Sequence, residues 1–231
     1  KELAGLIKQA GFLSTEFLAP FPDYKLPVSI VTEHGFSCDA FDAAALAWQS
    51  VRRDPQLPPV LAFSPELVWP TIVNNELALD LANSFLIVAS QAESDILVSS
   101  DILAWHFSCD RLAQYAKQAQ FIRNDVGDIK VLYRRLSKEI DFWSGQKLFT
   151  FNLPTAEPYK HGEPLLQMAV WTVTQDGWHP DDIGKFLLEY IKVLCELLEL
   201  DLREVKTSKS SKLPGSAFDL TPQNIIVLKT G

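Results

Sequence analysis

Hydrophobic residues recur at helical spacing along several long segments of the chain. The clearest segment is 178–200, where apolar residues three and four positions apart form one broad face. Pro180 stands in its first turn, and Asp181 and Asp182 complement the positive end of a helix dipole. A further helix is predicted to begin at the Ser64–Pro65 pair, a common helix start. The remaining helices, which bring the predicted number to about seven, cover 1–10, 39–53, 76–90, 100–123 and 129–143.

Strand patterns are fewer and shorter than helical ones. Alternating or β-branched stretches predict strands over 26–33, 60–63, 147–153 and 224–229. Regular alternation of strands and helices is missing, which disfavours a doubly wound nucleotide-binding fold. The pattern therefore predicts a mainly α (α+β) fold, with three or four short peripheral strands. Residues 1–202 are predicted to form a single mainly helical domain, and residues 203–231 a basic, Ser/Lys-rich segment that ends in a short strand.

Composition and charge narrow the class of protein. The formal net charge of the 231 residues is −8, which argues against nucleic acid as the main partner because that binding neutralises phosphates with Lys and Arg. Three cysteines are too few for a secreted disulfide scaffold. The strongest apolar stretch, 82–89, is much shorter than the roughly 20 residues needed to span a bilayer. We expect a soluble, intracellular (cytoplasmic) acidic protein without a membrane span.

One tetrapeptide, FSCD, occurs twice, and each copy follows a histidine closely. His34 and Cys38 come from the first copy, and His106 and Cys109 from the second. Two imidazoles and two thiolates are ligands that tetrahedral zinc accepts, so these four residues are a candidate metal site with zinc as its cofactor. Neither copy contains the C-x₂-C pair typical of zinc sites. The alternative is that both cysteines pack as small hydrophobic residues.

Cys38 is also a candidate nucleophile. The pattern predicts that it lies at the start of the helix over 39–53, where the helix dipole favours a thiolate. The stretch SCDAFDAAALA resembles the SCWAF stretch of papain-like proteases, in which the nucleophilic cysteine begins a helix. That resemblance implies a histidine base, for which His106, His161 and His179 are the candidates, and we place His106 first. The alternative interpretation is a helix cap beside a packed cysteine.

Basic residues concentrate in two segments. The predicted helix over 129–143 and the segment 203–212 supply candidate binding residues, namely Lys130, Arg134, Arg135, Lys138 and Lys206. Such runs are most often solvated faces, but they also suit acidic partners. The stretch REVKTS is similar to the E-x-K half of restriction-type nuclease cores, which implies that Glu204 would hold a metal and Lys206 would stabilise charge.

Three classes of function remain, and each would use different residues of the chain. We expect a non-enzymatic regulatory, scaffold or accessory domain that acts through protein–protein contacts or self-association, because the middle of the chain is basic and its last helix acidic. The second hypothesis is an enzyme with a Cys/His centre, with or without a metal, near Cys38. The third is a nucleic-acid-associated protein that uses the basic helix or the E-x-K segment.

Overall fold

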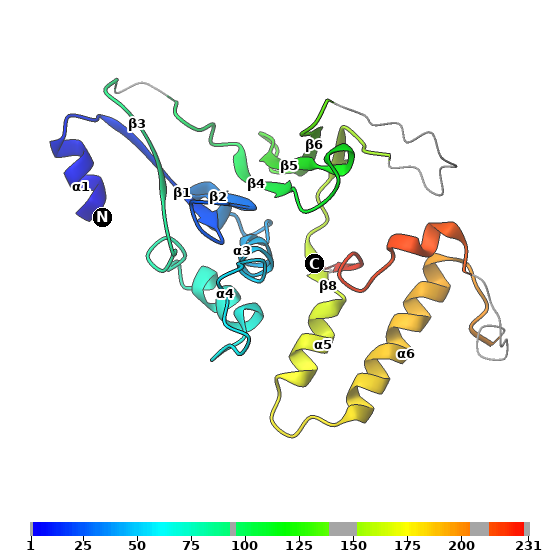
Figure 1. Ribbon diagram of the computed structural model, residues 1–231. Coiled ribbons are helices and arrows are strands. Elements are labelled where there is room, and N and C mark those ends of the chain that lie inside the picture. Colours follow the sequence, from blue (N-terminus) through cyan, green and yellow to red (C-terminus); the bar gives the residue numbers. More distant parts are fainter. Residues whose placement is uncertain (1, 93–95, 139–151, 204–212, 229–231) are drawn as a thin grey trace. The chain divides into compact units, whose positions relative to one another are not determined.

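The chain folds as two compact units, 1–159 and 160–231, in a computed structural model that describes residues 2–92, 96–138, 152–203 and 213–228 (Figure 1). The two units are therefore described separately.

The first unit is built on a seven-stranded antiparallel sheet in the order β3-β1-β2-β4-β5-β6-β7. Every neighbouring pair of strands is antiparallel. The strands are β1 Ser14–Phe21, β2 Ser29–Thr32, β3 Leu86–Ser90, β4 Ile102–Ser108, β5 Lys117–Arg123, β6 Ile129–Arg135 and β7 Ala156–Pro158. The prediction of a mainly helical fold with a few peripheral strands is therefore wrong, and the fold is α+β around a large sheet.

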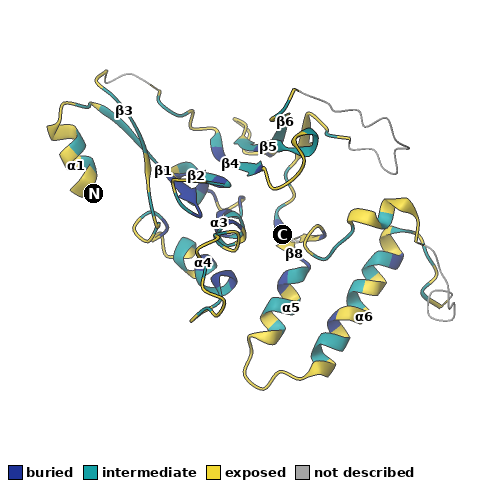
Figure 2. Ribbon diagram, in the orientation of Figure 1, coloured by how far each residue is buried: buried dark blue, intermediate teal, exposed yellow. Residues whose placement is uncertain are grey.

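Four α-helices and one 3₁₀ turn accompany this sheet. They are α1 Glu2–Gln9, α2 Glu33–Phe36, α3 Ala43–Val51, α4 Pro65–Asn74 and the 3₁₀ turn η1 Ala113–Tyr115. Helix α3 contacts β1, β2 and α4, and α2 contacts β2 and β4. Figure 2 shows buried residues gathered where β1, β2 and α3 meet. The small buried side chains of Ala43, Ala47 and Ser50 lie on one face of α3, so its backbone can approach the sheet closely.

Three predicted helices are strands in the structure. Residues 86–90 of the predicted helix 76–90 form β3, the predicted helix 100–123 becomes β4, η1 and β5, and residues 129–135 of the predicted helix 129–143 form β6. In β4 both faces carry apolar side chains, so alternation is hidden and the helical spacing of apolar residues is accidental. Residues 60–63 form no strand, and the predicted strand 147–153 lies almost wholly outside the described residues.

Thr32 organises the junction between β2, α2 and β4. The single hydrogen of its hydroxyl is shared between the carbonyl oxygens of Ile102 and Leu103, at 2.9 and 3.0 Å, and the hydroxyl oxygen accepts from the backbone N–H of Gly35 at 2.9 Å. Thr32 is thus the N-cap of α2. Gly35 packs directly on the Leu103 carbonyl, where no side chain fits. Leu103 lies at a register shift of β4, so one hydroxyl ties a helix start to a β-bulge.

The second unit contains an α-helical hairpin and a two-stranded sheet. Helices α5 Leu166–Val173 and α6 Pro180–Leu197 are joined by a short connection, and β8 Gly162–Pro164 pairs antiparallel with β9 Ile226–Leu228. Between α6 and β9 lies the 3₁₀ turn η2 Gly215–Asp219. The core of this unit is small: Leu165, Phe186 and Ile225 are buried together. The predictions of a helix over 178–200 and of a strand over 224–229 are confirmed.

The helices in the described part of the chain were also compared with the length and hydropathy that a bilayer span requires. None of them is both long and apolar enough to cross a membrane.

Replacing Gly35 with alanine tests the Thr32 junction. The new Cβ would overlap the Leu103 carbonyl, so we expect a loss of about 1–3 kcal/mol in the free energy of unfolding, measured by urea denaturation. Gly5→Ala in α1 is the control, because nothing lies within 4 Å of a Cβ there and alanine favours a helix. Equal midpoints for the two variants would contradict this account.

Candidate functional site

Cys38 lies in the core of the first unit and not at a helix start. Helix α3 begins at Ala43, and its N-cap is Asp42, whose carboxylate accepts from Ala45 N at 2.9 Å. The Cys38 side chain is buried, and its sulfur lies 3.9 Å from the Arg123 guanidinium nitrogen Nη1. The predicted helix start at residue 39 is therefore wrong. The helix dipole consequently gives no reason to expect a reactive thiolate at Cys38.

His106 lies in the middle of β4, opposite Ala119 of β5 and Ser29 of β2. Its ring nitrogen Nδ1 is 2.8 Å from the Ser29 hydroxyl oxygen. In the described residues no hydrogen bond joins it to Cys38. The structure thus assigns different partners to the two members of the predicted Cys/His pair.

The four predicted zinc ligands are dispersed. His34 lies in α2, Cys38 in the core, His106 in β4, and Cys109 is exposed just after β4. Among the residues that the structure describes, no three His, Cys, Asp or Glu side chains are grouped so that they could hold a metal ion. The FSCD repeat therefore places its two cysteines in unrelated environments.

The predicted basic helix is mostly a strand, so its charges divide between two faces of the sheet. Lys130 and Arg134 share one face of β6, and Arg135 lies on the other. Arg134 donates to Gln118 Oε1 at 2.8 Å, and Arg135 donates to the Gln114 carbonyl oxygen at 2.6 Å. Lys138 follows β6 in an irregular segment. Glu204 and Lys206, and with them the E-x-K similarity, lie outside the described residues.

A buried chain of hydroxyl groups ends at His106, and the sequence patterns did not indicate it. Ser50 of α3 donates to Ser29 Oγ at 2.8 Å, and Ser29 Oγ lies within hydrogen-bond distance of His106 Nδ1, at 2.8 Å. Burial lowers the pKa of His106 to about 4, and the positive charges of Arg53, Lys117 and Arg111 act in the same direction. At neutral pH the His106 ring is therefore uncharged.

The hydrogen-bonded Ser50–Ser29–His106 group is not accessible to a substrate, as a catalytic dyad would have to be. Both Ser29 and Ser50 have no exposed surface, so a substrate carbonyl cannot approach either hydroxyl. The partner of His106 Nδ1 is a hydroxyl group and not the orienting carboxylate of a hydrolytic triad. A sequence signal for Ser50 does exist, because it stands three residues after Ala47 on the alanine-rich side of the predicted helix.

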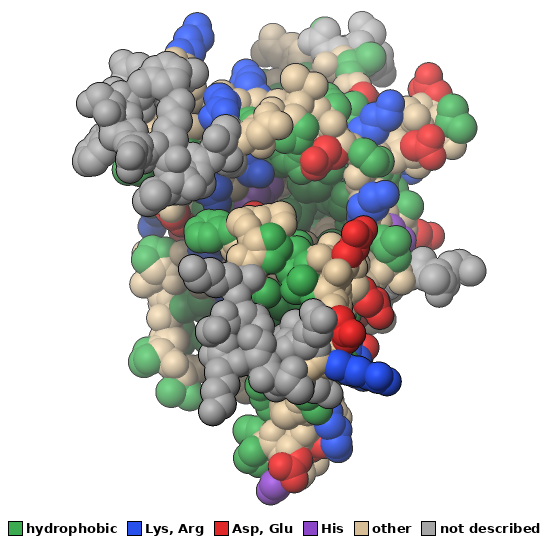
Figure 3. Space-filling view, turned by 90° about the vertical axis from the view of Figure 1, so that its right-hand side faces the viewer, with side chains coloured by type: hydrophobic (Ala, Val, Ile, Leu, Met, Phe, Trp, Pro, Cys, Tyr) green, Lys and Arg blue, Asp and Glu red, His purple; other side chains and the backbone are tan. Residues whose placement is uncertain are grey.

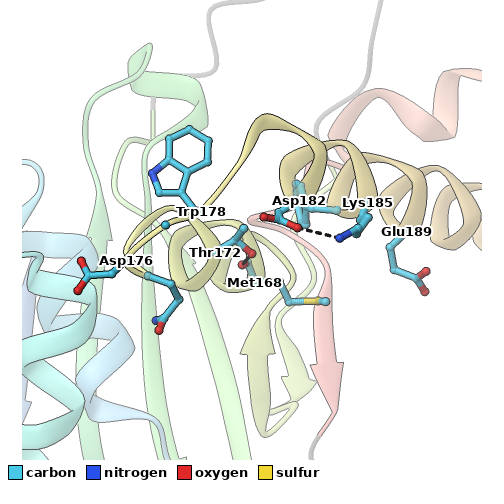
Figure 4. A pocket seen from close by; sticks show the side chains of 10 residues that line it. Met168, Thr172, Asp176, Trp178, Asp182, Lys185 and Glu189 are labelled. Carbon is cyan, nitrogen blue, oxygen red and sulfur yellow. Dashed lines mark hydrogen bonds and ion pairs between the residues drawn. The ribbon is translucent and has the colours of Figure 1, made fainter.

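The second candidate site is a groove on the α5–α6 hairpin, which we call the hairpin groove (Figure 4). It is open to solvent and has a volume of about 620 Å³. Figure 4 shows Met168 and Thr172 reaching it from α5, Asp176 and Trp178 from the connection, and Asp182, Lys185 and Glu189 from α6. Gln175, Gly177 and Phe186 complete the lining.

Local signals position the connection that forms one end of the groove. Gly177 adopts a φ of 76°, a left-handed conformation that glycine accepts without strain. His179 caps α6 through its Nδ1, which accepts from Asp181 N, while the Asp182 carboxylate accepts from His179 N at 3.0 Å. Asp182 also accepts from the Lys185 ammonium group at 2.8 Å, and this bond lowers the pKa of Asp182. These contacts hold the connection so that apolar Trp178 and acidic Asp176 and Asp182 all line the hairpin groove.

Thiol labelling distinguishes the packed cysteine from the nucleophile. Cys109 is exposed while Cys38 and Cys195 are buried, so we expect a neutral-pH alkylating reagent to modify Cys109 first. Peptide mass analysis over time gives the three rates, and labelling in urea should make them similar. Modification of Cys38 before Cys109 in the folded protein would restore the Cys/His enzyme hypothesis.

His106 should make the protein acid-sensitive. Its folded pKa of about 4 lies below the ordinary value of 6.5, so between these pH values the unfolded chain binds a proton that the folded chain does not. Stability should fall as pH drops from 6.5 towards 4, by on the order of 3 kcal/mol. In His106→Gln this component disappears, so urea midpoints at pH 7 and 4.5 should differ less than in the wild type. The same substitution at His161 controls for loss of an imidazole, and an unchanged pH slope in His106→Gln would contradict the assignment.

Comparisons with known proteins do not add a family to this geometry. No family model matches the chain, and neither the curated proteins nor the solved structures yielded a match.

Proposed function

We propose that this chain is a non-enzymatic binding protein whose α5–α6 hairpin takes up an apolar, positively charged segment of a protein partner. The observation that carries the proposal is the exposed apolar surface of the hairpin. Large hydrophobic side chains that are 36–51% exposed occur on both helices and in the connection, namely Met168, Trp171, Val173, Trp178, Leu187, Leu188 and Ile191. Exposed apolar side chains are typical of interaction sites when they gather on one part of a protein, and Trp and Met are enriched there.

The apolar side chains of α6 follow a helix-pairing pattern. Leu187, Ile191, Leu194 and Leu198 are spaced four, three and four residues apart, which places them in one stripe along the helix. Leu194 packs on the small core of the unit, whereas Leu187 is 49% exposed. The stripe therefore begins at the core and continues onto the surface, where it offers a seam for a helix of the partner.

Charge on the hairpin defines the complementary partner. Residues 166–198 contain five carboxylates and two lysines. Three of the carboxylates, on Asp176, Asp182 and Glu189, line the hairpin groove. At the lower end of Figure 3, where the α5–α6 connection lies, hydrophobic side chains reach the surface beside acidic and basic ones. A segment with an apolar face and flanking Lys or Arg complements this arrangement, whereas a nucleic acid would be repelled.

Leu187→Glu tests this surface. The probe is a fluorescein-labelled amphipathic helical peptide with leucines on one face and lysines on the other. We expect the wild-type chain of 231 residues to bind it, and Leu187→Glu to weaken binding about tenfold or more, because a charge would be placed on the apolar seam. Fluorescence anisotropy measures both dissociation constants.

Leu26→Glu is the matched control, because Leu26 is 76% exposed in the first unit. It should leave peptide binding unchanged, and a peptide with glutamates in place of lysines should bind more weakly than the basic one. Equal effects of the two leucine variants would overturn the proposal. Light scattering identifies a different occupant: a dimer that Leu187→Glu converts to a monomer would mean that the surface binds a second copy of this chain.

A further inference from the structure

Two loops leave the same end of the seven-stranded sheet. Loop 22–28 joins β1 to β2, and loop 109–116 joins β4 to β5. Strands β2 and β4 pair antiparallel, so the start of β2 and the end of β4 are neighbours. Their contact extends to the base of both loops, because the Phe107 N–H donates to the Val28 carbonyl oxygen at 2.7 Å. The two loops therefore emerge side by side, and we call them the paired loops.

Each of the paired loops carries an exposed leucine directly after a cation. Leu26 follows Lys25 and is 76% exposed, and Leu112 follows Arg111 and is 68% exposed. Tyr24, which is 63% exposed, adds an aromatic ring to the first loop. Side chains this exposed take little part in the packing of the first unit, so only another surface could remove them from water.

Hydrogen bonds hold the backbone of both loops. In the first loop the Asp23 carboxylate accepts from the backbone N–H groups of Lys25 and Leu26, at 2.8 and 3.3 Å. In the second loop the Leu112 carbonyl oxygen accepts from the backbone N–H of Tyr115 at 2.8 Å. A backbone that is already ordered loses little conformational entropy on binding. The two leucines are therefore presented at low entropic cost.

Positive charge exceeds negative charge at this end of the sheet. Within the paired loops, Lys25 and Arg111 balance Asp23 and Asp110 in number. The strand ends at the base of the loops add cations and no carboxylate, namely Lys117, Arg134 and Arg135. The β5–β6 turn at the opposite end, 124–128, contains two carboxylates and no cation. A negatively charged surface would therefore attract the paired loops first, although the net charge of the chain is −8.

We propose that the paired loops bind the surface of an anionic lipid bilayer. Tyr24, Leu26 and Leu112 enter the interface between the headgroups and the acyl chains, where a tyrosine ring is favoured. Lys25 and Arg111 contact the lipid phosphates. A bilayer takes up separate protruding side chains without a matching surface, whereas a protein partner needs a well-packed pocket for each of them. This surface lies in the first unit and is independent of the hairpin groove.

Vesicle sedimentation tests the proposal. The probe is vesicles of phosphatidylcholine and phosphatidylglycerol in equal parts, and vesicles of phosphatidylcholine alone are the reference. We expect the chain of 231 residues to sediment with the mixed vesicles, far less with the reference, and to be released by salt, which screens the attraction. Cys109 is an exposed reporter within the second loop, so the mixed vesicles should slow its alkylation by a charged reagent. Unchanged alkylation of Cys109 at saturating vesicle concentration would overturn the proposal.

Two matched pairs of variants locate the surface. Arg111→Gln should weaken binding of the mixed vesicles about fivefold, whereas Lys130→Gln, which removes the same charge at the start of β6 and away from the loops, should leave it nearly unchanged. Leu112→Ser should also weaken binding, whereas Val126→Ser should not, because Val126 is 86% exposed in the acidic β5–β6 turn. Equal effects within either pair would contradict the assignment to the paired loops.

Other occupants of the loops would give different results. If the peptide with leucines and glutamates protects Cys109 and the vesicles do not, the loops bind an acidic protein segment and the membrane proposal is wrong. If Leu187→Glu abolishes vesicle binding and Arg111→Gln does not affect it, the lipid binds the hairpin, which also overturns the proposal. Loss of vesicle binding in Arg111→Gln has no bearing on the binding of the basic peptide by the hairpin.

Discussion

The first unit depends on the close approach of Gly35 to the carbonyl oxygen of Leu103, fixed by the hydroxyl of Thr32. The Thr32 hydroxyl bonds to the carbonyl oxygen of Ile102, which is 70 residues away in the sequence. The same hydroxyl caps the N-terminus of α2. The approach leaves no room for a side chain at position 35. Because α2 is held there, the segment after it carries Cys38 and Phe41 into the core, and α3 follows across β1 and β2.

Small side chains on α3 then determine how closely the helix packs on the sheet. Ala43 and Ala47 let the helix pack near the sheet, and Ser50 continues the same face at its far end. There the hydrophobic row of the sheet gives way to Ser29 and His106, so the helix and the sheet meet through hydrogen bonds instead of apolar contact. Buried hydroxyl groups cost free energy unless they are paired, and this chain pairs both. The hydrogen bonds among Ser50, Ser29 and His106 are thus part of what holds the helix on the sheet.

The second unit meets a different constraint, that of size. A unit of 72 residues buries a smaller fraction of its surface than a larger domain does, and here the buried hydrophobic cluster of the described residues is Leu165, Phe186 and Ile225. Tyr190 adds one tie by donating to the Leu220 carbonyl at 2.6 Å. Much of the apolar surface of α5 and α6 remains in contact with water, which association with a partner would remove. The exposed apolar surface of the hairpin is therefore what supports the proposal of a protein segment as its partner.

Local chemistry in the sequence determined α6, because Pro180, Asp182 and the leucine spacing act within a few residues of one another. The same holds for α4, which begins at Pro65 as predicted, although the Ser64 hydroxyl donates to the Glu66 carboxylate and does not cap the helix. The sheet could be recognised only from the tertiary structure, because each strand is stabilised by pairing with its neighbours. The sequence pattern of β4 predicts a helix, and its pairing with β2 and β5 makes it a strand. It also decided the candidate sites, because His106 and Ser29 are 77 residues apart and the burial of Cys38 depends on α2. Pairing across such separations leaves no local pattern, and that is why the FSCD repeat suggested a site that the fold does not assemble.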